Sequence, residues 1–404
     1  MAAGPVERSV ARPARGTRPA NRRQLIIAAA TDLFSRNGYA GVSMGDVAEA
    51  VAIGPSALYR HFRGKQALLT TVVGDALDTL DAAITATEDE QLPDVAGALA
   101  AAVLKRRGAG VLWHREARQL APVDGTKFRA ALDRIALRVA LLVRSRRPGL
   151  GEAEAELLAW SALAVATSVS LHSLVLPEPE FITLLGGLIS TVIDAPILPS
   201  KPKVARNAKS PSLRAQSRRE TILAEATKLF AANGFARVST EDIGASVGIS
   251  GPSVYNHFPS KSDILLAAML RGDEWLRMDM HRAFARASDP GDGLNRLLES
   301  YCAFVFDNPH LIQVLVSESN HLPEPERHRT RAAQYAYIAE WVNLLRRVHP
   351  EWDAAQARIR VQAVQTLFND IAVVPSLRRY PNIESTLTTI GAELLAITDR
   401  PTNR

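Results

Sequence analysis

Apolar residues recur every three or four positions along most of the chain, which is the spacing that gives an α-helix one buried face. Over residues 22–37, for example, Ile26, Ala29, Leu33 and Phe34 would share such a face. Runs in which apolar and polar residues alternate between turn residues, the pattern of β-strands, are scarce. The pattern therefore predicts an all-α protein.

The same helical pattern occurs twice. Aligned without a gap, residues 22–69 and 218–265 are identical at 21 of 48 positions. Weaker similarity continues at a slightly larger offset, so that Glu116 corresponds to Glu318 and Pro148 to Pro350. Because a repeat of this length defines the units of a fold, we expect two units of about 200 residues each.

Each copy of the repeat predicts a helix-turn-helix. The first helix would end at Gly38 or Gly234, where a left-handed residue commonly closes a helix. Ser43 and Ser239 are each followed three residues later by an aspartate, which is typical of a capped helix start. This short second helix, which would bury Val47 or Ile243, leads through a tight turn into a third.

The turn and the third helix differ between the copies. The turn position holds Ala52 in the first copy and Gly248 in the second, and an alanine with positive φ would cost about 1 kcal/mol. A hairpin used only for packing would carry apolar residues all around its last helix. Here only Leu58 and Phe62, or Val254 and Phe258, are expected to point inward. The remaining positions form an outer surface: Pro55, Ser56, Tyr59, Arg60 and His61 in the first copy.

Positive charge is concentrated just ahead of each copy. The formal net charge is +6, of which residues 1–23 contribute +5 and residues 200–219 contribute +7, so the rest of the chain is acidic. Basic arms can be plain solvated linkers, but next to a helix-turn-helix they favour a polyanion partner, double-stranded DNA.

With these features in place, the run AVAIGPSALYRHFRGKQALL (residues 50–69) closely resembles the DNA-binding domain of TetR-type transcriptional regulators. The tandem arrangement, together with VLWHREARQL, resembles the double-TetR repressors of actinobacteria that govern lipid-import and lipid-catabolism operons. The resemblance is specific over the two 48-residue blocks and only architectural beyond them.

The resemblance implies a domain order. We expect a basic arm (1–21), a helix-turn-helix domain (22–69), a helical regulatory domain (70–196), a basic linker rich in Pro and Lys (197–215), a second helix-turn-helix domain (216–265) and a second regulatory domain (266–400).

The resemblance also implies which residues touch DNA. Contacts to phosphates are expected from Ser43, Tyr59, Lys65, Ser239, Tyr255 and Lys261, in keeping with the usual phosphate partners. Base edges are expected to face Pro55, Ser56 and Arg60 in the first copy and Gly251, Pro252, Ser253 and Asn256 in the second. His61 and His257 are expected to pack or to touch a phosphate rather than to read a base, and Arg22, Arg23, Arg218 and Arg219 are expected to follow either the minor groove or the backbone.

TetR-like proteins normally act as homodimers, and a chain with two units can replace the dimer by folding its units against each other. The helices expected at 153–176 and 179–194 would then pack on those expected at 353–374 and 382–400. We call the two helix-turn-helix domains, residues 22–69 and 216–265, the first and the second head. Because they are no longer constrained to be identical, we expect an intrachain pseudo-dimer that binds an asymmetric operator. Repression is the commoner outcome for such folds, by analogy only.

The regulatory domains are expected to enclose a small hydrophobic effector of lipid, sterol or acyl-CoA type. Candidate ligand contacts are Trp113, His114, Glu116, Phe304, Phe306, Gln313 and Glu318, although core aromatics and surface charges are the more ordinary interpretation of each. One unit could have lost its pocket and serve as a structural partner.

Other classes of function are disfavoured. The sequence contains no GxGxxG or HExxH motif and no Walker phosphate-binding loop, so we expect no enzyme and no cofactor. The group His310, Glu318, His321, Glu324, Glu326 and His328 could suggest a metal site, but its surroundings are typical of a solvated turn. The single cysteine, Cys302, excludes an internal disulfide, favours the cytoplasm and is expected to be buried. The uncharged stretch 157–176 is interpreted as a buried helix, not a membrane span.

Overall fold

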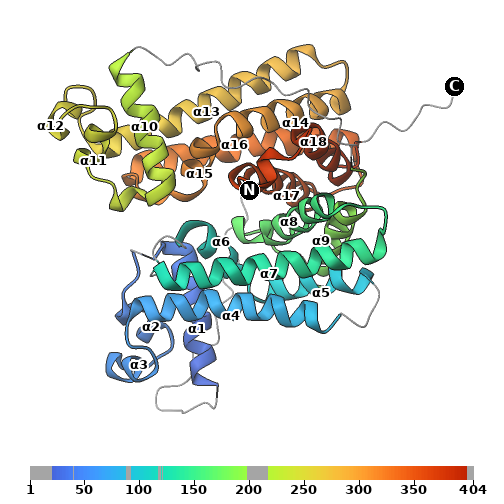
Figure 1. Cartoon of the computed structure of the whole chain (residues 1–404), viewed down its shortest axis with the longest axis horizontal. Helices are drawn as coiled ribbons and strands as arrows, with labels where there is room; N and C mark the ends of the chain where they lie inside the picture. The colour runs from blue at the N-terminus through green and yellow to red at the C-terminus, as the bar shows by residue number, and fades with distance from the viewer. Residues whose placement is uncertain are drawn as a thin grey trace. The chain divides into compact units, whose positions relative to one another are not determined.

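The computed structural model describes residues 21–39, 41–87, 92–116, 120, 122–197 and 217–397. Within those ranges the regular structure is helical and no strand occurs, which confirms the all-α prediction. Most of the predicted basic arm and linker, residues 1–20 and 198–216, lies outside the described residues. The contacts divide the chain into two compact units, built mainly from α1–α9 and from α10–α18 (Figure 1).

The first unit begins with three helices of the repeat and continues with a bundle of longer ones. The helices are α1 (Arg22–Asn37), α2 (Met44–Ala50), α3 (Pro55–His61), α4 (Lys65–Thr85), α5 (Leu92–Lys105), α6 (Arg107–Glu116), α7 (Pro122–Arg146), α8 (Glu152–Thr167), the 3₁₀ turn η2 (Ser168–Leu171) and α9 (Glu178–Asp194). Figure 1 shows α4 and α7 running side by side, and α1 packs against both α4 and α6.

The second unit repeats this order. Its helices are α10 (Arg218–Asn233), η3 (Phe235–Arg237), α11 (Thr240–Ser246), α12 (Gly251–Val254), α13 (Lys261–Arg286), α14 (Pro290–Asp307), α15 (Pro309–Ser317), η4 (Ser319–His321), α16 (Glu324–Val348), α17 (Ala354–Val373), η5 (Leu377–Arg379) and α18 (Ile383–Leu394). The bundle helices α13, α14 and α16 pack on one another, and α15 packs against α10, α13 and α17 (Figure 1).

An aromatic cluster fills the middle of the second bundle. The ring of Tyr301 lies 6.0 Å from that of Trp341 and 6.3 Å from that of Phe368, and the last two side chains are fully buried. Cys302, the next residue along α14, is also buried, as expected, and burial raises the pKa of its thiol. The thiol therefore stays protonated and acts as a small apolar side chain.

The uncharged stretch 157–176 of the first unit forms a shorter helix than the sequence predicts. Glu152–Leu171 is long and apolar enough to cross a membrane, but 67% of its most apolar window is buried inside the protein, as in a core helix. A continuous helix to residue 176 is wrong, because α8 ends at Thr167 and η2 ends at Leu171. The guanidinium of Arg107 donates to the carbonyls of Val169 and Leu174, both at 2.5 Å, which holds this segment out of helical geometry.

Candidate nucleic-acid interface

The second helix of each repeat begins with a complete capping box. In the first copy the Asp46 N–H donates to Ser43 Oγ (3.1 Å) and the Ser43 N–H donates to Asp46 Oδ2 (2.7 Å). Ser239 and Asp242 form the same pair at 3.1 and 2.8 Å. Hydrogen bonds from Ser43 and Ser239 lower the pKa values of the two aspartates. Both serines are exposed, so each presents a fixed helix start where the predicted phosphate contact would lie.

The turn that follows has the positive φ that the sequence comparison suggested. φ is 55° at Ala52 and 71° at Gly248, so the alanine of the first copy occupies a conformation that glycine adopts without cost. The N–H of Ile53 donates to the Ala48 carbonyl and that of Ile249 to the Gly244 carbonyl, at 3.0 and 2.9 Å. The two turns therefore share one geometry in spite of their different residues.

The third helix presents the same kind of surface in each copy, over different lengths. Leu58, Phe62, Val254 and Phe258 are buried as expected. In the first copy Pro55, Ser56, Tyr59, Arg60 and His61 are all exposed. In the second copy Pro252, Tyr255 and Asn256 are exposed, whereas Ser253 and His257 are half-buried. Tyr59 and Tyr255 are 52% and 53% exposed, and the Tyr255 hydroxyl lies 3.5 Å from Thr240 Oγ1 at the start of α11.

Two predictions for the second copy are wrong in detail. Gly251 does not face outward: it is buried, and a Cβ there would lie 3.1 Å from Glu241 Oε1. The third helix does not run to Phe258, because α12 ends at Val254. Beyond it the backbone tightens into i→i+3 hydrogen bonds, such as that from the Tyr255 N–H to the Pro252 carbonyl (3.2 Å).

An arginine from the first helix of each repeat covers the end of the third. The guanidinium carbon of Arg23 lies 4.7 Å from the Phe62 ring centre, and that of Arg219 lies 4.0 Å from the Phe258 ring centre. Arg218 donates to the Val247 carbonyl (3.0 Å), and Arg22 is half-buried at the start of α1. Three of the four predicted groove arginines thus hold the head together, by stacking or by a hydrogen bond.

The paired lysines also have a structural role. The Nζ atoms of Lys65 and Lys261 lie 4.3 Å from the ring centres of Tyr39 and Phe235. Lys261 Nζ also donates to the carbonyls of Phe235 (2.9 Å) and Val238 (2.8 Å), and burial lowers its pKa. Since an ammonium has three donors, Lys261 has one N–H left for the predicted phosphate contact.

Glu318 connects the second head to its bundle. This carboxylate is 2% exposed and accepts hydrogen bonds from the Phe235 backbone N–H (3.1 Å) and from Ser317 Oγ (2.7 Å). The His321 ring stacks on Phe235 with 5.3 Å between ring centres. Sequence reasoning placed Glu318 among the ligand contacts, whereas the structure places it at the joint between α15 and the turn that enters α11.

The other ligand candidates divide into three groups. Trp113, His114 and Glu116 lie on α6, and their side chains are outside the described part of the structure. Phe304 and Phe306 are buried, and Phe304 meets the edge of Trp275 at 5.5 Å between ring centres. Gln313 lines a pocket of the second unit.

Comparison with known proteins agrees with this geometry. The model of the TetR family of bacterial regulatory proteins matches residues 26–72 and 222–268. The nucleoid occlusion factor SlmA of Vibrio cholerae is 31% identical over 119 residues, which cover 29% of this chain and 60% of that protein. The HTH-type transcriptional activator FasR of Mycolicibacterium smegmatis is 25% identical over 120 residues, 30% of this chain and 54% of that protein. The chain therefore spans little more than half the length of these relatives.

Solved structures give a further match of low similarity. A TetR-family transcriptional regulator from Bordetella parapertussis superimposes with a TM-score of 0.42 at 18% identity, over 45% of this chain and 95% of that one. The ketosteroid transcriptional regulator KstR2 of Mycobacterium tuberculosis superimposes with a TM-score of 0.38 at 23% identity, over 46% of this chain and 94% of that one.

Proposed function

Because this chain is a TetR-family regulator with two DNA-binding domains in tandem, we propose that one molecule binds an asymmetric DNA operator with two unlike heads. We propose further that the protein is a repressor that leaves its operator when a small hydrophobic effector binds. Its site of action is the cytoplasm, where it reaches chromosomal DNA.

One observation carries the proposal: the two heads have the same turn geometry, but they carry different residues at one equivalent, exposed position next to the tyrosine. Arg60 and Asn256 lie 196 residues apart, the offset of the repeat, and both are exposed next to an exposed tyrosine. An arginine favours bidentate contact with guanine and an asparagine with adenine, each worth about 1–3 kcal/mol of discrimination. The two heads would therefore prefer different bases.

Half-site spacing follows from the same idea. Two heads that enter successive major grooves require half-sites about 34–36 Å apart from centre to centre. We propose that the α8, α9, α17 and α18 helices supply an intrachain interface that sets this spacing. A single chain per operator, measured by mass photometry on the DNA complex, is the expected stoichiometry, whereas two chains per operator would contradict the pseudo-dimer.

The test of unlike heads is saturation mutagenesis of the bound DNA. Genome-wide capture of bound fragments first supplies the operator, and every base pair is then varied. We expect Arg60→Gln to relax base preference in one half-site only and Asn256→Ala in the other only. Tyr59→Phe is the matched control, because loss of a phosphate contact weakens binding about equally across sequences. The same preference in both half-sites, arranged as a clean palindrome, would refute the proposal.

Effector release and the sign of regulation need a separate assay. A reporter transcribed from the captured operator should rise when the gene for this protein is deleted. FasR is named as an activator, and a fall in reporter signal would assign that sign here as well. If the protein binds DNA but senses no ligand, then no lipid, sterol or acyl-CoA will displace the operator fragment.

A further inference from the structure

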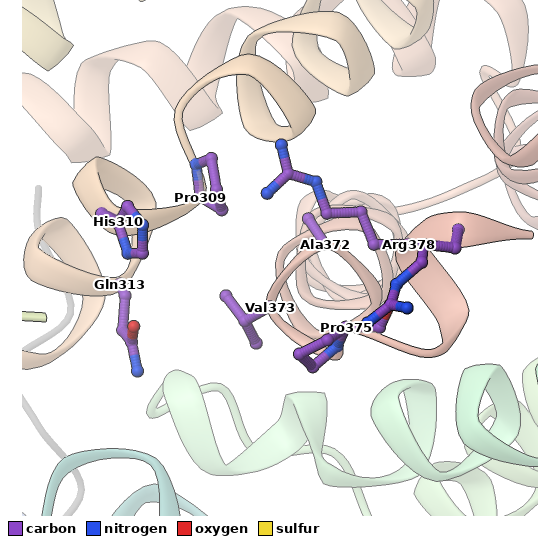
Figure 2. Close-up of a pocket in the computed structure, with 8 residues that line it drawn as sticks. Pro309, His310, Gln313, Ala372, Val373, Pro375 and Arg378 are labelled. Carbon is purple, nitrogen blue, oxygen red and sulfur yellow. The ribbon is translucent and has the colours of Figure 1, made fainter. Parts of the chain in front are cut away.

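A pocket of about 290 Å³ opens in the second unit, between the start of α15, the end of α17 and the turn that follows α17. Figure 2 shows His310 and Gln313 on one side, facing Ala372, Val373 and Arg378 on the other. Arg379 completes the polar lining. The volume is at the lower limit of ordinary small-molecule sites, about 300–1,000 Å³, so a small occupant or one end of a larger molecule would fit.

The charge of this lining is positive. Arg378 donates to the Phe306 carbonyl (2.6 Å) and Arg379 donates to the Pro375 carbonyl (3.1 Å). These bonds orient both side chains yet leave most of the five N–H donors of each guanidinium unused. Among the residues that the structure describes, no carboxylate lines the pocket and no ion pair joins either arginine.

The charged groups around His310 also make this side of the pocket positive. Partial burial lowers the pKa of this imidazole, and the nearby charges of Lys228 and Arg378 lower it further. Glu225 opposes the effect, and its carboxylate is paired with Lys228 at 2.7 Å. An anion in the pocket would stabilise protonated His310, so anion binding and proton uptake would be linked.

The first unit has different residues at the corresponding positions. At the offset of 202 residues, Arg107 corresponds to Pro309, and its guanidinium donates to the carbonyls of Val169, His172 and Leu174 at 2.5 Å. Leu176 and Pro177 stand where the second unit has Arg378 and Arg379. In the first unit an arginine therefore serves the backbone, whereas in the second unit two arginines face a cavity.

We propose that this pocket of the second unit binds a small anion, a carboxylate or a phosphate that carries a short apolar group. The charged end would lie between Arg378, Arg379 and His310, and the apolar part would lie against Ala372 and Val373. Guanidinium groups match both kinds of oxyanion by bidentate hydrogen bonds. The first unit would not bind such an anion.

The pocket has a direct path to the second head, and this consequence rests on the proposed function. α15 begins at the pocket and is nine residues long, so it spans about 13 Å. The residue after its last turn is Glu318, whose carboxylate accepts the Phe235 N–H at the entry to the head. A shift of α15 on anion binding would therefore move the turn that precedes α11.

The test measures anion binding to the full chain without DNA. Isothermal titration calorimetry with inorganic phosphate and, separately, with hexanoate should show one site per chain for at least one of the two. Arg379→Gln should weaken that binding about tenfold or more, as expected for loss of a charged hydrogen-bond donor. Arg347→Gln, an exposed arginine on α16 away from the pocket, is the matched control and should bind as the parent does.

The pH dependence and the choice of anion sharpen the result. Binding of hexanoate, which stays ionised near neutral pH, should tighten as the pH falls through the titration of His310, and His310→Gln should remove that dependence. Binding of phosphate alone indicates a phosphate ester as the natural ligand, and binding of hexanoate alone indicates a carboxylic acid. Failure of both anions to bind, or equal binding by the Arg379→Gln variant, would overturn the proposal. Since operator binding is measured separately, these failures leave the DNA-binding function untouched.

Discussion

Replacement of Glu318 by alanine should loosen the second head and leave the first unchanged. The substitution removes the acceptor of the Phe235 N–H, and Phe235 is only 9% exposed, so water does not readily replace that acceptor. A buried N–H left without a partner costs about 1–3 kcal/mol. At about 2 kcal/mol, local opening of the turn becomes about 30-fold more frequent.

Hydrogen exchange read by mass spectrometry measures this opening directly. Peptides that cover 231–245 should exchange about 30-fold faster in the Glu318→Ala variant. The equivalent peptides at 35–49, in the other copy of the repeat, serve as an internal control in the same molecule. Glu318→Gln retains an acceptor oxygen and should change exchange much less, and Glu299→Ala, an exposed carboxylate on α14, should change nothing. Unchanged exchange at 231–245 in Glu318→Ala would show that this carboxylate does not hold the turn.

Three further outcomes are expected. Ala52→Gly should stabilise the first head by about 0.5–1 kcal/mol and Gly248→Ala should destabilise the second by a similar amount, because both positions have positive φ; local exchange within each turn checks the signs. Burial raises the pKa of Asp273 from its ordinary value of about 4 to about 6, so the fold loses stability as the pH rises between these two values and the loss is complete above about 6. Asp273→Asn should therefore unfold at higher urea concentration than the parent at pH 7.5 and at the same concentration near pH 4. Replacement of the basic residues in 201–214 by serine, which leaves Arg218 and Arg219 of α10 in place, should flatten the dependence of operator affinity on salt concentration, and an unchanged slope would remove that segment from the interface.

The repeated heads were largely predictable from the sequence because local rules determine them. The serine-to-aspartate spacing predicted both capping boxes, and the identity of Gly248 predicted the positive φ that Ala52 shares. Periodicity placed Leu58 and Phe62 inside correctly. These features depend on residues within a few positions of each other, so the chain specifies them without reference to distant contacts.

The misassigned residues are those whose environment comes from distant parts of the chain. Glu318 lies 83 residues from the N–H that it accepts, and no spacing rule connects it with Phe235. Lys261 follows the serine that caps α13, and only the folded turn shows that its ammonium takes two carbonyls of the 235–238 segment. One signal was available for Arg23 and Phe62: both are identical in the two copies, which is expected of a pair that holds a shared scaffold in place.

Duplication explains why the same chain can keep its scaffold and change its surfaces. The arginine stack, the lysine over an aromatic ring and the capping box recur in both units, as expected for contacts that hold the helix-turn-helix together. Positions that contact only solvent or a ligand carry no such requirement. Arg60 and Asn256 differ at the outer surface, and Arg107 and Pro309 differ at the start of the sixth helix of each unit. If both differences serve function, the two units divide the work: each head reads its own bases, and only the second bundle receives the anion. Arg379→Gln should then weaken anion binding, measured by calorimetry, while base preference in each half-site remains unchanged; a changed base preference in either half-site would contradict this division.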